Sequence, residues 1–233
     1  MQTEILYEDK QILVAYKPAG LAVQTARIGE PDMTSELKNY VKGGYLGLVH
    51  RLDQPVEGLL VFGRTKAATA ALSKQLAEGT LHKQYRAVLY GAPAQAAGEL
   101  TDYLYKTRDY CAKIVSAEQA QETGAKRAVL RYCILKTTQV SENEQLSLAE
   151  ISIETGRFHQ IRAQMAHAGL PLLGDLKYGS ERSVQCSREA GVRQVALCAN
   201  ALQFVHPAKG TTLPFTVTPR GGVFQKFGMP DEA

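Results

Sequence analysis

Cysteine is scarce in this sequence, and the scarcity argues against two kinds of scaffold. The four cysteines, Cys111, Cys133, Cys186 and Cys198, lie far apart, and none belongs to a Cys-x-x-Cys pair. Zinc sites built on such pairs are therefore not expected. A chain of 233 residues also has no need of a disulfide framework. We expect four reduced, buried thiols in a cytoplasmic protein.

Long apolar runs and a strong charge imbalance are also missing. No stretch approaches the roughly 20 apolar residues of a membrane span. The first ten residues, MQTEILYEDK, are acidic and lack the apolar run of a signal peptide. Lys and Arg outnumber Asp and Glu by 27 to 23, a net charge of +4. This excess permits nucleic-acid binding without requiring it, and on charge alone an ordinary soluble enzyme is favoured.

Apolar runs bounded by turn residues predict more strands than helices. The predicted strands lie at 12–16, 58–63, 83–90, 147–154 and 197–205. One helix is expected between Thr65 and Gly79, and another from Ile161 to Gly169. The weakly patterned span 106–128 suggests hairpins with exposed turns. We therefore predict an α+β fold, a mainly antiparallel mixed sheet flanked by helices and loops, in a single domain over residues 1–233.

Three polar clusters stand beside predicted strands and carry residues that could perform chemistry. They are His50-Arg51-Leu52-Asp53, Lys83-Gln84-Tyr85-Arg86 and the run from Gly156 to Arg162. Taken one at a time, each has an ordinary structural interpretation. An aspartate before a turn is usually a turn or cap residue, and a strand tyrosine usually belongs to the core. A basic residue at the start of a helix is usually solvated.

Taken together and in order, the clusters resemble the motifs of one enzyme family. HRLD followed by GLLVFGRT, then KQYRAVLYG, then TGRFHQIRAQMAHAGLPLLGDLKYG, is similar to the RluA-type pseudouridine synthases. The opening ILYEDKQILVAYKPAGLAV and the late VALCANALQFVHP resemble the first and last motifs of that family. Ordered motifs over nearly the whole chain are far more specific than HRLD alone.

The resemblance implies roles for the residues at matching positions. Asp53 corresponds to the essential aspartate, and Tyr85 to the active-site tyrosine of the KxY motif. Arg162 corresponds to the basic residue that pairs with the aspartate, and Arg51 to the arginine that fills the gap left by an extruded base. Further motif residues expected at the substrate are His50, Lys83, Arg157 and His159. The basic residues expected on an RNA-binding rim are Lys17, Lys83, Arg86, Arg157 and Lys177.

The implied reaction converts uridine in RNA to pseudouridine. It breaks the N1–C1′ bond, turns the uracil and rejoins it to the sugar through C5. A carboxylate such as Asp53 could stabilise C1′, attack it or remove the neighbouring C2′ proton, and the sequence leaves these alternatives open. A cation beside the carboxylate favours its ionised form. The reaction involves no redox change or group loss, so no cofactor or metal is expected.

The implied partner is structured RNA, either ribosomal or transfer RNA. The target base must leave its stack, and unstacking is easiest in loops. Many members of the family carry a small N-terminal RNA-binding domain, whereas the first motif here begins by residue 4. We therefore expect the catalytic domain to recognise RNA by itself, as a monomer.

The sequence departs from the family pattern just after Asp53. Gln54-Pro55-Val56-Glu57 stands where the family commonly has a small polar residue before the glycine, and Gly63-Arg64 stands where Ala-Lys is frequent. Two other functions remain open. One is an RNA-binding protein that keeps the fold without catalysis. The other is a metal-dependent hydrolase with the candidate ligands His50, Asp53, His159 and His167. The spacing of these residues is poor for a metal site.

Overall fold

Strands dominate the computed structural model, which describes residues 1–27, 29–142 and 144–229. Most neighbouring strands pair antiparallel and short helices flank them, which confirms the predicted α+β class. The chain divides into two units. The first comprises Met1–Gln84 and Cys198–Pro219, and the second comprises Tyr85–Leu197 and Arg220–Ala233. The expectation of a single catalytic domain stays a prediction.

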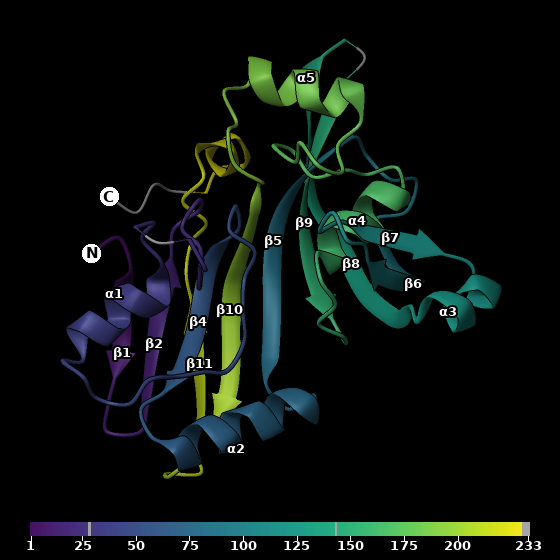
Figure 1. Cartoon of the computed structure of the whole chain (residues 1–233). Coiled ribbons are helices and arrows are strands. Elements are labelled where there is room, and N and C mark those ends of the chain that lie inside the picture. The colour runs from purple at the N-terminus through teal and green to yellow at the C-terminus, as the bar shows by residue number, and fades with distance from the viewer. Residues whose placement is uncertain (28, 143, 230–233) are drawn as a thin grey trace. The chain divides into compact units, whose positions relative to one another are not determined.

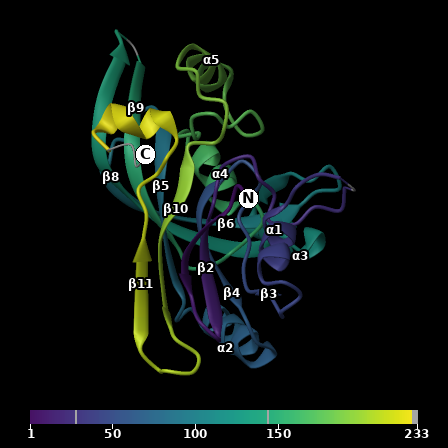
Figure 2. The same cartoon turned by 90° about the vertical axis from the view of Figure 1, so that its left-hand side faces the viewer.

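The sheet of the first unit has the strand order β1-β2-β4-β10. Neighbours pair antiparallel except β10, which runs parallel to β4. The short β3 pairs with β4, and β11 runs antiparallel beside β10, as Figure 2 shows. Both β2 and β4 are buried along their whole length, in keeping with their continuous apolar sequences. The strands are β1 (Glu4–Glu8), β2 (Ile12–Lys17), β3 (Gly47–Leu48), β4 (Glu57–Gly63), β10 (Leu197–Val205) and β11 (Thr212–Thr216).

Two helices accompany this sheet. The predicted helix is confirmed as α2 (Lys66–Ala77), where the Thr65 hydroxyl accepts a hydrogen bond from the Ala68 amide at 3.0 Å. The sequence reasoning missed α1 (Met33–Tyr40), which lies beside β1 and β2 in Figure 1. Its own cap is Asp32, whose carboxylate accepts from the Ser35 amide. The residues that form the core of this unit are Ile12, Val14, Leu59, Val61, Leu72, Leu81, Leu202 and Phe204.

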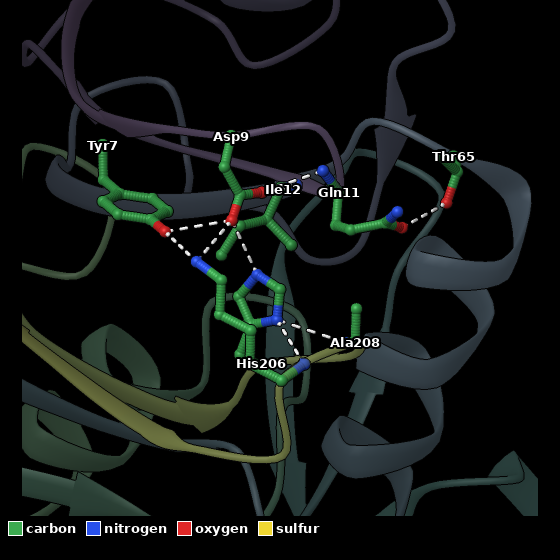
Figure 3. A network of polar contacts seen from close by, with 8 residues as sticks. Tyr7, Asp9, Gln11, Ile12, Thr65, His206 and Ala208 are labelled. Atoms are coloured by element: carbon green, nitrogen blue, oxygen red, sulfur yellow. Dashed lines mark hydrogen bonds and ion pairs between the residues drawn. The ribbon is translucent and has the colours of Figure 1, made fainter.

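A polar network joins the turn after β1 to the turn after β10 (Figure 3). The buried His206 donates from Nε2 to Asp9 at 2.8 Å, while its Nδ1 accepts from the amides of Ala208 and Lys209. Burial raises the pKa of Asp9, but hydrogen bonds from the Gln11 and Ile12 amides, His206 and Lys209 outweigh it, so the net pKa is well below the usual range. The carboxylate therefore stays ionised and ties the two turns together.

The sheet of the second unit has the strand order β5-β9-β8-β6-β7. The pairs from β9 to β7 are antiparallel, and the long partners β8 and β9 shift register twice. Figure 1 shows α4, the second predicted helix, close to β6 and β7. The strands are β5 (His82–Tyr90), β6 (Ala97–Lys106), β7 (Ala112–Val115), β8 (Lys126–Ser141) and β9 (Glu144–Ile153). The helices are α3 (Ala117–Thr123), α4 (Gln160–His167), α5 (Glu181–Glu189) and the 3-10 turn η1 (Gly222–Phe227).

Two expectations for the second unit need correction. The span 106–128 was expected to form only hairpins, but it also contains α3. Ser116 and Gln119 form a capping box there, a signal that was present in the sequence. The cysteines were expected to be buried. All four are free thiols, but only Cys186 and Cys198 are buried, whereas Cys111 is half-buried and Cys133, in β8, is exposed.

In the ranges 1–27, 29–142 and 144–229, no helix has the length and apolar character needed to cross a membrane.

Candidate active site

Asp53 lies in the loop between β3 and β4, at the first position of a tight turn. The Val56 amide donates to the Asp53 carbonyl at 3.0 Å and closes this turn. Asp53 is half-buried, and its neighbour Arg51 is exposed. The turn is also held from outside, because the Gly20 amide donates to the Gln54 carbonyl at 2.9 Å and the Gln54 side chain donates back to the Gly20 carbonyl at 3.0 Å. The backbone of the loop that carries Asp53 is therefore held both by a hydrogen bond within the turn and by hydrogen bonds to Gly20.

Lys17, the last residue of β2, also forms a hydrogen bond to this turn. Its side chain is fully buried, and Nζ donates to the carbonyl oxygens of Pro18, Leu21 and Gln54 at 3.0, 2.7 and 3.0 Å. Burial lowers the pKa of Lys17 to about 7, whereas the charges of Asp53 and Glu57 raise it. The expectation that Lys17 lies on an exposed RNA-binding rim is wrong, because all three of its donors serve backbone groups inside the first unit.

A buried tyrosine–glutamate pair lies beneath the same turn. The Tyr16 hydroxyl, at the end of β2, donates to the carboxylate of Glu57, the first residue of β4. Both side chains are buried. The next residue, Gly58, has φ +127°, and a Cβ there would lie 2.5 Å from backbone atoms of Ala199. Only glycine fits that approach, which explains why the chain keeps a glycine after the unusual Glu57.

His50 and Lys83 are two further members of the predicted set in the first unit. His50 is buried, and its Nε2 accepts from the Val61 amide at 3.3 Å. Burial and the charge of Lys83 lower the pKa of His50 to about 3, so the ring is neutral near pH 7. Burial also lowers the pKa of Lys83. The described contact of His50 is therefore with β4, and a role for His50 at the substrate stays a prediction.

In the second unit, Arg162 forms a buried ion pair that the sequence reasoning did not find. Its Nε and Nη2 atoms donate to the two carboxylate oxygens of Asp175 at 2.7 and 2.8 Å. Both side chains are nearly inaccessible, with exposed fractions of 6% and 1%. Asp175 and Tyr178 belong to the GDLKYG part of the motif that carried the resemblance, in which only Lys177 was given a role. Tyr85 is likewise buried, in β5.

An aromatic group surrounds the start of α4. His159 caps this helix in a left-handed conformation, with φ 51°, and its ring stacks on Phe158 with centroids 3.7 Å apart. Its Nδ1 lies 2.8 Å from the hydroxyl of Tyr178. The Tyr178 hydroxyl also accepts from the Ala112 amide at 2.7 Å, so it is held by both partners. Burial is the largest influence on Tyr178 and raises its pKa.

Exposed basic side chains lie next to this aromatic group. The Lys106 ammonium lies 4.2 Å from the ring centroid of Tyr110 and 4.7 Å from that of Phe158. Lys177, on the predicted rim, is exposed and donates to the Tyr110 carbonyl at 2.8 Å. Arg157 is exposed as well, with Nε donating to the Arg127 carbonyl. Cations and aromatic rings lie side by side here, an arrangement suited to nucleic acid.

The predicted site residues are divided between the two units. Arg51, Asp53, His50, Lys17 and Lys83 lie in the first unit, and the others lie in the second: Tyr85, Arg86, Arg157, His159, Arg162 and Lys177. Arg86 is half-buried and pairs with Glu150 at 2.5 Å. The pairing of Asp53 with Arg162 stays a prediction. Over the described part of the chain, no group of three or more His, Cys, Asp or Glu side chains is arranged to hold a metal ion.

Comparison with known sequences identifies relatives over most of the chain. Residues 11–167 match the family of RNA pseudouridylate synthases. A Rickettsia conorii protein named ribosomal large subunit pseudouridine synthase C is 33% identical over 219 residues, which cover 93% of this chain and 70% of that protein. Synthase D of Zymomonas mobilis is 31% identical over 223 residues, covering 91% of this chain and 68% of the relative. The uncharacterized RNA pseudouridine synthase YhcT of Bacillus subtilis is 32% identical, covering 88% of this chain and 65% of its own length.

Comparison with solved structures agrees on the fold. Human RNA pseudouridylate synthase domain containing 4 has a TM-score of 0.75 at 24% identity, covering 97% of this chain and 94% of the human chain. Human RNA pseudouridylate synthase domain containing 1 also reaches 0.75, at 20% identity, covering 92% and 82%. The chain thus spans about two thirds of the curated relatives and nearly all of one solved chain.

Proposed function

This chain belongs to the RluA-type family of RNA pseudouridine synthases, and on that premise we propose that it isomerises uridine to pseudouridine in structured RNA. The observation that carries the proposal is the family match over residues 11–167, which includes Asp53, Tyr85 and Arg162 at their motif positions. The names of the relatives from Rickettsia and Zymomonas favour ribosomal RNA as the substrate class.

Asp53 is the proposed catalytic carboxylate. During the reaction the N1–C1′ bond breaks and a C5–C1′ bond forms, while the proton lost from C5 is balanced by one gained at N1. The product is an isomer of the substrate, so the step needs no oxidant, reductant or second substrate. C1′ becomes electron-poor as its bond to N1 breaks, and a carboxylate at that atom stabilises it or attacks it. The backbone ties from Lys17 and Gly20 support this role, since they hold the Asp53 turn in place.

Access to Asp53 requires the target base to leave its stack. Asp53 is half-buried, so a base within a helix cannot reach it without being extruded. Arg51 is exposed two residues before Asp53 and is the proposed residue that occupies the gap left in the RNA. Loop uridines are the favoured targets, because their unstacking costs the least free energy.

RNA contacts in the second unit are proposed at the cationic and aromatic group around the start of α4. Tyr110 is 64% exposed and Lys106 lies against its ring, so a base can stack on the tyrosine while the ammonium meets phosphate. Arg157 and Lys177 are the exposed members of the predicted rim that lie in this unit. Lys17 is not part of the rim, because its side chain is buried and its donors serve backbone carbonyl groups.

Pseudouridine mapping tests the proposal directly. Ribosomal and transfer RNA from cells with and without this protein would be mapped, and purified protein would then be assayed on RNA labelled with tritium at uridine C5. We expect a specific uridine to be converted, with tritium released to water, and Asp53→Asn to abolish release without lowering the melting temperature. Substantial turnover by the Asp53→Asn protein would overturn the assignment of Asp53. RNA binding without any conversion by the wild type would instead indicate a binding protein that only keeps the fold.

A further inference from the structure

The Asp175 carboxylate orients the buried guanidinium of Arg162 within its own plane. Asp175 receives Nε at 2.7 Å and Nη2 at 2.8 Å, a bidentate contact along one edge of the group. Two parallel hydrogen bonds between planar groups prevent rotation within that plane, which one bond to one oxygen would permit. An arginine carries five N–H donors, and Asp175 takes two of them. The directions of the other three then follow from where Asp175 lies.

Asp175 is itself held rigidly. Its Oδ1 also accepts from the backbone amides of Lys177 and Tyr178, at 3.0 and 3.2 Å, so the carboxylate cannot turn without breaking bonds to the chain. Its exposed fraction is 2%, which leaves little access for water to replace a lost partner. The loop that carries Asp175 therefore works as a fixed support for Arg162, 13 residues earlier in the chain.

The ring of Tyr178 makes a second contact with the same guanidinium. The Arg162 Cζ atom lies 5.1 Å from the Tyr178 ring centroid. The far end of that ring is anchored as well, because the hydroxyl accepts from the Ala112 amide at 2.7 Å and lies 2.8 Å from His159 Nδ1. An edge contact to Asp175 and a ring contact to Tyr178 together determine the plane and the rotation of the group.

The geometry points to Asp175, supported by Tyr178, as a positioning residue for Arg162 in uridine isomerisation. This inference rests on the proposed function, in which Arg162 supports the catalytic aspartate. A cation keeps a catalytic carboxylate ionised and aimed only when the cation is itself held in the productive orientation, and a displacement of about 1 Å can cost about 10²-fold in rate. Asp175 acts through Arg162 and is not assigned any contact with RNA.

The main test compares Asp175→Asn with Asp102→Asn in single-turnover and steady-state tritium release. Asp102 is the matched control, since its carboxylate accepts from Gln164 on the same helix at 2.8 Å. We expect Asp175→Asn to lower kcat by about 10²-fold with KM changed by less than about twofold. Asp102→Asn should leave kcat within about twofold of the wild type even if its melting temperature falls. Equal losses of kcat in both variants would show a merely structural effect and overturn the inference.

A double-mutant cycle tests whether Asp175 acts through Arg162. Arg162→Met keeps the volume but removes the cation. Adding Asp175→Asn to this variant should change kcat by less than about twofold, because the group to be positioned is already gone. The melting temperature of the double variant should exceed that of Arg162→Met alone, since it no longer buries an unpaired carboxylate. A second drop in kcat as large as the one in the wild-type background would show that Asp175 acts independently.

A measurement without turnover separates this inference from the proposed function. The Nε–H resonance of Arg162, followed by NMR, should be protected from solvent exchange in the wild type and in Asp102→Asn, and unprotected in Asp175→Asn. Protection that persists in Asp175→Asn would overturn the positioning role. If the wild type converts no RNA but this pattern holds, the proposed function fails while the anchoring of Arg162 stands. An active wild type whose Asp175→Asn variant keeps most of its kcat leaves the function standing and refutes the inference.

Discussion

The Nζ atom of Lys17 lies 3.0 Å from the carbonyl oxygen of Gln54, so the end of β2 holds the residue that directly follows Asp53. The two residues are 37 positions apart in the sequence. A lysine normally presents its charge to solvent, but here the ammonium replaces water as the donor to three carbonyl groups. The most buried basic residue of the predicted set therefore holds the loop of the proposed catalytic aspartate from the inside.

Lys17→Met should destabilise the protein more as pH rises from neutral. The pKa of Lys17 is about 7 in the folded state and 10.5 in the unfolded state, so between these values the unfolded chain binds more protons. The contribution of Lys17 to the free energy of unfolding therefore rises with pH between these two pKa values, by at most about 1.4 kcal/mol per pH unit. Urea denaturation of both proteins at about pH 7 and about pH 9.5 measures the difference. Lys66→Met, at an exposed lysine of α2, is the control and should show no such trend. A constant gap between wild type and Lys17→Met would contradict the burial of the charge.

Arg162→Ala should lower the free energy of unfolding by about 3–5 kcal/mol, because it leaves the Asp175 carboxylate buried without its partner. The free energy of unfolding of Arg162→Lys should lie between those of the wild type and Arg162→Ala, since an ammonium keeps the charge but cannot reproduce the bidentate contact. Chemical denaturation gives both values. Arg157→Ala, at an exposed arginine just before the same helix, should stay within about 0.5 kcal/mol of the wild type. An unchanged stability in Arg162→Ala would mean that the pair is open to water in solution.

Arg51→Ala should slow the reaction more on a tightly stacked hairpin than on a loosely stacked one. The exposed Arg51 is proposed to hold the flipped-out state open, so its loss matters most where restacking competes strongly. Single-turnover rates on two hairpins that share the target loop and differ only in the stacking around the uridine would measure this. Equal slowing on both would place Arg51 in the bond chemistry.

A hairpin of about 15–20 nucleotides that carries the mapped uridine should be a competent substrate, because one chain of this size cannot track much more RNA. The logarithm of its binding constant should fall with the logarithm of the salt concentration with a moderate slope, since each phosphate contact adds about 0.7–0.9 to that slope. Filter binding and tritium release on the hairpin and on the full transcript test this. If only intact ribosomal subunits or long transcripts were modified, recognition by this chain alone would be refuted.

Much of the fold could be predicted because its signals are local. Apolar runs such as 12–16 and 58–63 form strands since neither face of those segments tolerates water. Thr65 caps α2 as expected, because the bond from the Ala68 amide spans only three residues. The same kind of signal at Asp32 and Ser116 was not recognised, and α1 and α3 were missed for that reason. The short length of these helices left little periodicity to read.

The sequence by itself determined the family and the candidate residues, because ordered motifs record which chemical groups stand at which positions along the chain. Only the tertiary structure decided the partners of those residues. Arg162 meets Asp175 across 13 positions and Lys17 meets Gln54 across 37, and no periodicity links such distances. The physical reason is that a buried charge is stabilised by whichever acceptor the fold brings within about 3 Å. That choice depends on how strands and loops pack, and the order of the residues along the chain does not show this packing.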